Sequence, residues 1–240
     1  TVAKADVIKE ASNSGTKTYI IEDNAAAITA AVTATTGATP DVQTLNSGTT
    51  VTVSGTATFA QAATIAGIAK AIVYNISDVK ANIPGSTTAA LNEAVNITVT
   101  NNVTFAQAKI IDDATNSGSN TYNISDTAAN LAAGIVTSVT AINGAGTVTS
   151  AIATAAQGAT LASISQAIVY SISDSASNIV ANIGGLNESV NIESTDSCTF
   201  AQGKVIEDAT NSGSITYNIS DSAANIAVGI GSDNAVISSA

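Results

Sequence analysis

Tyr122-Asn123-Ile124-Ser125-Asp126 opens the stretch YNISDTAAN, a motif that occurs in five versions along the chain. Alternating apolar and polar residues from Thr121 to Asp126 predict a strand with one buried face. The Asp and the alanine-rich stripe behind it predict a helix with that Asp as its N-cap. The five tyrosines are all that the chain has, and the other four versions begin at Tyr19, Tyr74, Tyr170 and Tyr217.

The motif belongs to a longer internal repeat. Residues 1–32 align without a gap to residues 104–135 and 199–230, and a second repeat type that begins at Thr58 returns at Thr154. The two types alternate, so the chain reads as one repeat domain, 1–240, with an insertion at 35–43 in its first unit. The predicted units, each of about 48 residues, are 1–50, 51–95, 96–146, 147–190 and 191–240.

Each unit contains two sequence signals for the start of a helix. Thr-x-x-Gln before an apolar-periodic run is a capping box, in which each side chain accepts a hydrogen bond from the other residue's backbone amide. The expected boxes are Thr58 with Gln61, Thr104 with Gln107, Thr154 with Gln157, and Thr199 with Gln202, while Thr1 with Lys4 keeps only half of one. The Asn-Ser-Gly triplets at 116–118 and 211–213 are expected to stop these helices. The expected Asp caps of the second helices are Asp78, Asp126, Asp174 and Asp221.

Regular strand–helix alternation predicts the fold class. Parallel strands joined by helices make right-handed crossovers. Strands covered on both faces are apolar throughout, whereas these alternate, so helices are expected on one face only. We therefore predict an α/β repeat protein, a right-handed βα solenoid with one parallel sheet of ten strands and helices on one face. The alternative is a set of compact α/β modules of about 95 residues.

Composition limits the chemistry. The chain carries a net charge of −11 and has no His and no Arg, its seven cations all being Lys. An acidic surface repels nucleic acid and anionic membranes, and no apolar run is long enough to insert in a membrane. No nucleophile–base pair and no phosphate loop is recognisable, and the one cysteine, Cys198, cannot form an internal disulfide. We expect a protein that is not an enzyme and has no cofactor.

Two acidic pairs and, more weakly, the aligned Glu10 are candidates for binding a metal. Oxygen ligands suit calcium, but neighbouring residues on a helix point to different sides. The simpler interpretation of these acidic residues is a solvated helix face, and the functional interpretation is a weak calcium site. The candidates are Asp112, Asp113, Glu207 and Asp208.

The two ends of the sequence suggest assembly. Thr1 already stands at a helix cap, and residues 235–239, which include Val236, Ile237 and Ser238, read as an additional strand. Such a strand would extend the sheet of a second copy, and a head-to-tail contact of this kind builds filaments. The partner is thus expected to be the chain itself, or else neighbouring repeats of a longer chain.

The paired signatures TFAQA and Y-x-I-S-D-T/S-A-A-N resemble the repeats of large, acidic bacterial surface proteins, of the S-layer-like and adhesin-like kinds found in cyanobacteria and marine bacteria. The resemblance implies an extracellular or cell-surface location and a scaffold role. The function we expect is a non-enzymatic structural protein of the cell surface or of an extracellular filament, self-assembling through its repeat ends or polar sheet face. Alternatives are a segment of a large adhesin that binds glycan or ice, and a virion or tail structural protein.

Overall fold

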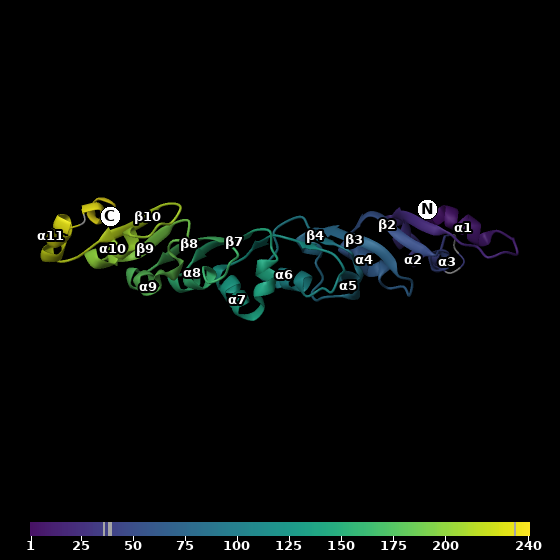
Figure 1. Ribbon diagram of the computed structural model, residues 1–240, viewed down its shortest axis with the longest axis horizontal. Helices are drawn as coiled ribbons and strands as arrows, with labels where there is room; N and C mark the ends of the chain where they lie inside the picture. The colour runs from purple at the N-terminus through teal and green to yellow at the C-terminus, as the bar shows by residue number, and fades with distance from the viewer. Residues whose placement is uncertain (36, 38–39, 233) are drawn as a thin grey trace. The chain divides into compact units, whose positions relative to one another are not determined.

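The computed structural model describes residues 1–35, 37, 40–232 and 234–240 (Figure 1). It consists of two compact units, an N-terminal unit of Thr1–Tyr122 and a C-terminal unit of Asn123–Ala240. The division falls inside the third copy of the tyrosine motif. The finer division into five repeats stays a prediction from the sequence.

The N-terminal unit alternates short strands with short helices. Its elements are α1 (Val2–Glu10), β1 (Ile20–Asn24), α2 (Ala25–Thr33), α3 (Val42–Ser47), β2 (Thr50–Ala57), α4 (Phe59–Ile65), β3 (Ile72–Asp78), the 3-10 helix η1 (Lys80–Asn82), α5 (Ala89–Glu93), β4 (Ile97–Val99), α6 (Phe105–Asp112) and β5 (Asn120–Thr121).

The C-terminal unit repeats this alternation. Its elements are β6 (Ile124–Ser125), α7 (Ala128–Asn143), β7 (Val148–Ala153), α8 (Ala155–Leu161), β8 (Ile168–Asp174), α9 (Ala176–Ala181), the 3-10 helix η2 (Ile183–Gly185), β9 (Ile192–Cys198), α10 (Phe200–Glu207), β10 (Ile215–Ile219), α11 (Ala223–Ser232) and α12 (Asn234–Ser238).

Each unit holds one five-stranded sheet in which all pairings are parallel and neighbouring strands follow each other in the chain. The α/β class is therefore confirmed. The prediction of a single ten-stranded sheet is wrong, because the third tyrosine strand is interrupted. β5 ends at Thr121 and β6 begins at Ile124, which leaves Tyr122 and Asn123 outside both strands.

The strands are buried on one face, as their alternation predicts. In β3, Ile72, Tyr74 and Ile76 are buried, whereas Val73 and Asn75 between them are exposed or half-buried. The same order of residues in β8 gives the same pattern. The core is made of these strand residues and of small helix residues, since the predicted alanine stripe of α2 is buried through Ala25, Ile28 and Ala31.

The predicted capping boxes are confirmed at the starts of α4, α6, α8 and α10. In each box the Thr hydroxyl accepts the Gln amide N–H, and the Gln side chain accepts the Thr amide N–H at 2.9–3.0 Å. The boxes join Thr58 to Gln61, Thr104 to Gln107, Thr154 to Gln157, and Thr199 to Gln202. The first amides of a helix have no acceptor within the helix, and each residue of a box supplies one. The residues of the box themselves therefore determine where these short helices begin.

The first repeat keeps the predicted half of a box. The Thr1 hydroxyl accepts the amide of Lys4 at 3.4 Å. A lysine side chain has no acceptor atom, so the return bond that Gln61, Gln107, Gln157 and Gln202 make to their Thr amides has no counterpart there.

The predicted Asp caps are wrong by one residue. The N-cap of α7 is Thr127 and that of α9 is Ser175, so neither Asp126 nor Asp174 takes that place. After Asp78, η1 begins beyond Val79 without a side-chain cap, and after Asp221 it is Ser222 whose hydroxyl accepts the Asn225 amide. The reason is that the Asp carboxylates bind other groups.

The predicted strand at residues 235–239 is also wrong, because the helix α12 occupies that segment. Val236 is fully buried, and its carbonyl oxygen accepts the Tyr217 hydroxyl at 2.9 Å. The carbonyls of Thr44 in α3 and Ala90 in α5 accept tyrosine hydroxyls in the same way. The segment therefore takes the place of the short helix that precedes a strand, and the proposed strand addition through Val236, Ile237 and Ser238 has no strand to use.

The Asn-Ser-Gly triplets lead into strands rather than end helices. α6 ends at Asp112, several residues before Asn116. Asn116 donates its side-chain amide to the Val95 carbonyl at 3.0 Å, and the Gly118 amide donates to the same carbonyl at 2.8 Å. A Cβ on Gly118 would lie 2.5 Å from that carbonyl oxygen and would also collide with the Asn96 side chain, so only glycine fits.

We expect Gly118→Ala to lower the free energy of unfolding by about 1–3 kcal/mol, because the added methyl group must displace the backbone at Val95, which leads into β4. Urea denaturation followed by circular dichroism measures the change. Gly85→Ala is the matched control in the same unit, since nothing lies within 4 Å of its Cβ position. Equal destabilisation by both variants would contradict the close approach at Gly118.

Candidate functional site

The Asp of the tyrosine motif ties the end of its strand to the helix before it. One oxygen of Asp78 accepts the first amide of α4, from Phe59, at 2.9 Å, although the two residues are 19 positions apart. A carboxylate at the positive end of a helix is favoured by the helix dipole and by a charge-assisted hydrogen bond. The same bond, at 3.0 Å, joins Asp23 to Val2, Asp174 to Ala155 and Asp221 to Phe200.

The second oxygen of the Asp organises the turn that follows. In Asp174 it accepts the Ser175 amide and the Asn178 side chain, both at 2.8 Å. Asp78, Asp126 and Asp221 bind the asparagine four residues later in the same way. The asparagine of the repeated motif is therefore a partner of the aspartate. Its fixed spacing was visible in the sequence, but its role was not recognised there.

These hydrogen bonds lower the pKa of the carboxyls. Burial raises the pKa of Asp78 and Asp174, but hydrogen bonds from backbone amides and from the asparagine outweigh it, so both pKa values lie below the usual one. For Asp221 the bond from Asn225 is the largest cause of a lowered pKa, followed by the amide of Phe200. Asp78, Asp174 and Asp221 are thus held as carboxylates, which is the form that the helix ends need.

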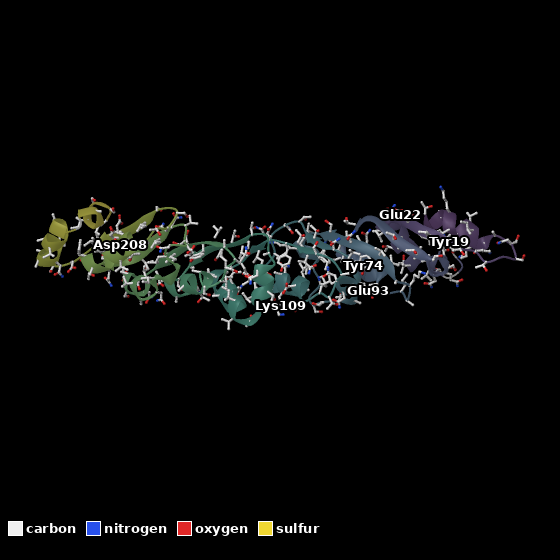
Figure 2. All side chains as sticks on the ribbon, in the orientation of Figure 1. Tyr19, Glu22, Tyr74, Glu93, Lys109 and Asp208 are labelled. Carbon is white, nitrogen blue, oxygen red and sulfur yellow. The ribbon has the colours of Figure 1, made fainter. Side chains whose placement is uncertain are left out.

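The tyrosines join the sheet to the helices from inside the core. The Tyr74 hydroxyl donates to the Ala90 carbonyl of α5 at 2.7 Å (Tyr74 is labelled in Figure 2). Tyr170 donates toward Gly185 in η2 at 2.8 Å and Gly158 in α8 at 3.2 Å. Burial raises the pKa of Tyr170 to about 12, and the negative charge of Glu188 adds to the shift. These hydroxyls therefore stay protonated and act as structural donors.

A series of polar hydrogen bonds runs from the middle of β3 to the residues that stand directly before β4 and β5. Asn96 donates its side-chain amide to Asn75 at 2.9 Å and accepts the Ser119 amide at 2.9 Å. In the C-terminal unit, Asn191 accepts the Ser214 amide at 2.9 Å. The sequence predicted Asn96 on the polar face of its strand, but the hydrogen bonds that it makes to both neighbouring strands could not be read from alternation alone.

The four acidic metal candidates are engaged individually. Asp113 pairs with Lys109 at 2.8 Å, and Asp208 pairs with Lys204 at 3.4 Å (Lys109 and Asp208 are labelled in Figure 2). Glu207 accepts the Tyr217 hydroxyl, and Asp112, at the aligned position of the N-terminal unit, is half-buried. Among the residues that the structure describes, no group of three or more acidic or cysteine side chains could hold a metal ion. The calcium site stays an untested prediction.

A charged cluster that the sequence reasoning missed lies in the first repeat. The Lys9 ammonium stands 3.1 Å from Asp41, 3.2 Å from Asp6 and 3.3 Å from Glu10, and both aspartates are buried. Burial lowers the pKa of Lys9, but its bonds to the three carboxylates outweigh burial and raise the pKa above the usual value. The cluster fastens α1 to the insertion.

The signal for this cluster was a charge reversal between the aligned copies. Lys9 aligns with Asp112 and Glu207, and Asp6 aligns with Lys109 and Lys204. The insertion brings a buried acid, Asp41, so the copy that carries it needs a cation at that position. Asp41 also caps α3, and its pKa is lowered because backbone amides and Lys9 outweigh the effect of burial.

Little reactive chemistry is exposed in the described residues. Burial raises the pKa of the Cys198 thiol, whose sulfur contacts the Ser194 hydroxyl at 3.5 Å, so a reactive thiolate is disfavoured. A surface hollow of about 380 Å³ lies between α4 and α5, and Asp78 is the one ionisable group among the residues that line it. That carboxylate already accepts three hydrogen bonds.

No helix in the described part of the chain has the length and apolar character that crossing a membrane requires. Comparison with known proteins gives no match to a family model, to a curated protein or to a solved structure.

Replacing Asp174 by Asn should lower the free energy of unfolding by about 1–3 kcal/mol at pH 7, because the helix end then loses a charged acceptor. Because its folded pKa is depressed, this stabilisation is complete above the unfolded pKa of about 3.9 and is lost as the pH falls through the folded pKa. Urea titrations at neutral and acidic pH should therefore show the two proteins converging in acid.

Asp208→Asn is the control for Asp174, since the Asp208 side chain is 64% exposed and makes a surface pair. A loss for Asp208→Asn as large as that for Asp174→Asn would show that general charge, rather than the helix-end bond, is responsible.

Tyr170→Phe keeps the buried ring but leaves the Gly185 carbonyl without its donor, so we expect a loss of about 1–3 kcal/mol in the free energy of unfolding. Chemical denaturation compares it with Val169→Ala, a change at the exposed neighbour. If Tyr170→Phe were as stable as the parent protein, the hydroxyl bond would have no structural role.

Proposed function

We propose that the chain is a non-enzymatic structural protein of the bacterial cell surface or of an extracellular filament. The observation that carries the proposal is how the repeated side chains are used. The tyrosine, aspartate and asparagine of the motif bind backbone or side chains of other elements in their own repeat. Residues repeated for a reaction or a ligand would present free polar groups, whereas these serve to join the strand and the helices of each repeat.

The proposed architecture of each unit is a right-handed α/β solenoid with helices on one face of its sheet. Two features support it: parallel strands that neighbour each other in chain order, and strands buried on one face. Figure 1 draws α4 and α5 on one side of β3 and β4, and α8 and α9 on one side of β7 and β8. Right-handed crossovers are the general rule for such connections.

The proposed location follows from surface chemistry and from the resemblance of the repeats to acidic bacterial surface proteins. A net charge of −11 favours solubility outside the cell and disfavours binding to nucleic acid. Lacking disulfides, such a protein would depend on stacked repeats for rigidity, since each repeat buries its apolar face on its neighbours.

A segment of a large adhesin is the second candidate. The observation in its favour is the outer face of the sheets, where Thr52 and Thr56 of β2 lie beside Val73 and Asn75 of β3. Exposed hydroxyl and amide groups in parallel rows offer hydrogen bonds to a glycan or to ice.

The test of the leading proposal is immunogold labelling of intact cells of the source organism with an antibody to the chain. We expect label on the cell surface or on extracellular filaments. Label confined to the cell interior would contradict the proposal, label on virus particles would favour the virion alternative, and binding in a glycan array or to ice would favour the adhesin alternative.

A further inference from the structure

The outer face of each sheet, whose side chains alternate with the buried strand residues, carries almost no charge. No lysine stands on a described strand, although the chain holds seven. The aspartates of the strands bind the first amides of helices, as Asp78 does at Phe59. The acidic side chains that the described strands place on the outer faces are Glu22 of β1 (labelled in Figure 2) and Glu193 of β9. The charge of this acidic chain is therefore concentrated elsewhere.

Short side chains, many of them hydroxyl-bearing or apolar, make up the outer faces. Strand pairing sets Thr52 beside Val73 in the N-terminal sheet and Thr149 beside Val169 in the C-terminal sheet. The two valines occupy the same place in the repeat and are 47% and 54% exposed. Because these side chains are short, a second sheet can pack against such a face at the usual distance of about 10 Å.

Several of the larger polar side chains on and beside these faces are already hydrogen-bonded within their own unit. The Asn75 side chain accepts the Asn96 side-chain amide at 2.9 Å, and Asn96 accepts the Ser119 hydroxyl at 3.1 Å. The Ser173 hydroxyl donates to Glu193 at 3.1 Å. A polar group that keeps its hydrogen-bond partner is buried at little cost. These faces therefore suit contact with a protein surface, whereas a glycan site would present such groups free.

Charge indicates which protein surface fits. Two copies of a chain with a net charge of −11 repel each other through their charged parts, and least where their outer faces approach. The centres of protein interfaces are in general depleted of charged residues. The outer face of a second copy has the same short side chains and the same lack of charge, so it is the matching partner.

The size of the faces limits the strength of one such contact. With strands about 4.8 Å apart and about 3.3 Å per residue, each five-stranded face covers roughly 400 Å². Two faces in contact would bury about 800 Å² in all, less than the ~1,200 Å² at which stable complexes begin. A single contact is therefore weak, but each chain has one face in each unit, and contacts through both reinforce each other.

We propose that copies of this chain associate through the outer faces of their sheets, face against face. The inference rests on the proposed structural function and names the surface that assembly uses. The residues at the centre of the contact are Val73 and Val169, because β3 and β8 are the middle strands of their sheets.

The first test measures the mass of the parent chain by light scattering over a wide concentration range, at low and at high salt. We expect association that strengthens at high salt, because salt screens the repulsion between the acidic parts and leaves an uncharged contact intact. Association that weakens at high salt would indicate a contact between opposite charges and would overturn the proposal. A parent chain that stays monomeric at every concentration would also overturn it.

The second test places a charge at the centre of each face through Val73→Glu and Val169→Glu. The double variant should associate at least about tenfold more weakly than the parent, because like charges then oppose each other across the contact. Each single variant keeps one intact face and should not grow beyond a dimer.

Val136→Glu is the matched control, since it adds the same charge at a position of α7 that is 82% exposed. It should associate like the parent, and circular dichroism checks that every variant is folded. A folded double variant that associates as strongly as Val136→Glu would contradict the face-to-face contact. These results leave the proposed surface location untouched, because the immunogold label reports on that independently.

Discussion

The fold depends on carboxylates at the ends of strands, which bind the N-termini of the helices that precede those strands. Four tyrosine-motif aspartates accept the first amide of a helix that lies 19 to 21 residues earlier. A helix end leaves its first amides without internal partners, and these helices are short, so an outside acceptor matters more to them than to long ones. Asp196 accepts the first amide of α9, from Ala176, in the same way. The rule therefore also holds for a helix that follows a tyrosine motif.

A thin core makes these polar links important. Aromatic residues are 3% of the chain, and alanine supplies much of the buried helix surface. Burying an alanine gains little free energy compared with a leucine or phenylalanine. Buried tyrosines compensate in two ways, because the ring fills space between the layers and the hydroxyl satisfies a helix carbonyl. The repeat thus relies on regular hydrogen bonds as much as on apolar area.

The sequence predicts elements well where the signal is local. Thr-x-x-Gln boxes and alternating strands need only a few neighbouring residues, and both are confirmed. It fails where a side chain serves a distant partner. Asp174 resembles an N-cap in the sequence, and its bond to the distant Ala155 shows otherwise. Val236 resembles a strand residue because a segment of five residues is too short to distinguish the apolar pattern of a strand from that of a short helix. The Lys9 cluster depends on Asp41, 32 positions away, so only a comparison of aligned copies could have indicated it.

Amide hydrogen exchange tests the central claim most directly. The amides of Phe59, Ala155 and Phe200 stand at the first position of a helix, where exchange is ordinarily fast because no helix carbonyl protects them. If aspartates of the next strand bind them, these three amides should exchange as slowly as amides in the middle of the same helices. Exchange at the rate of an unstructured peptide would contradict the account.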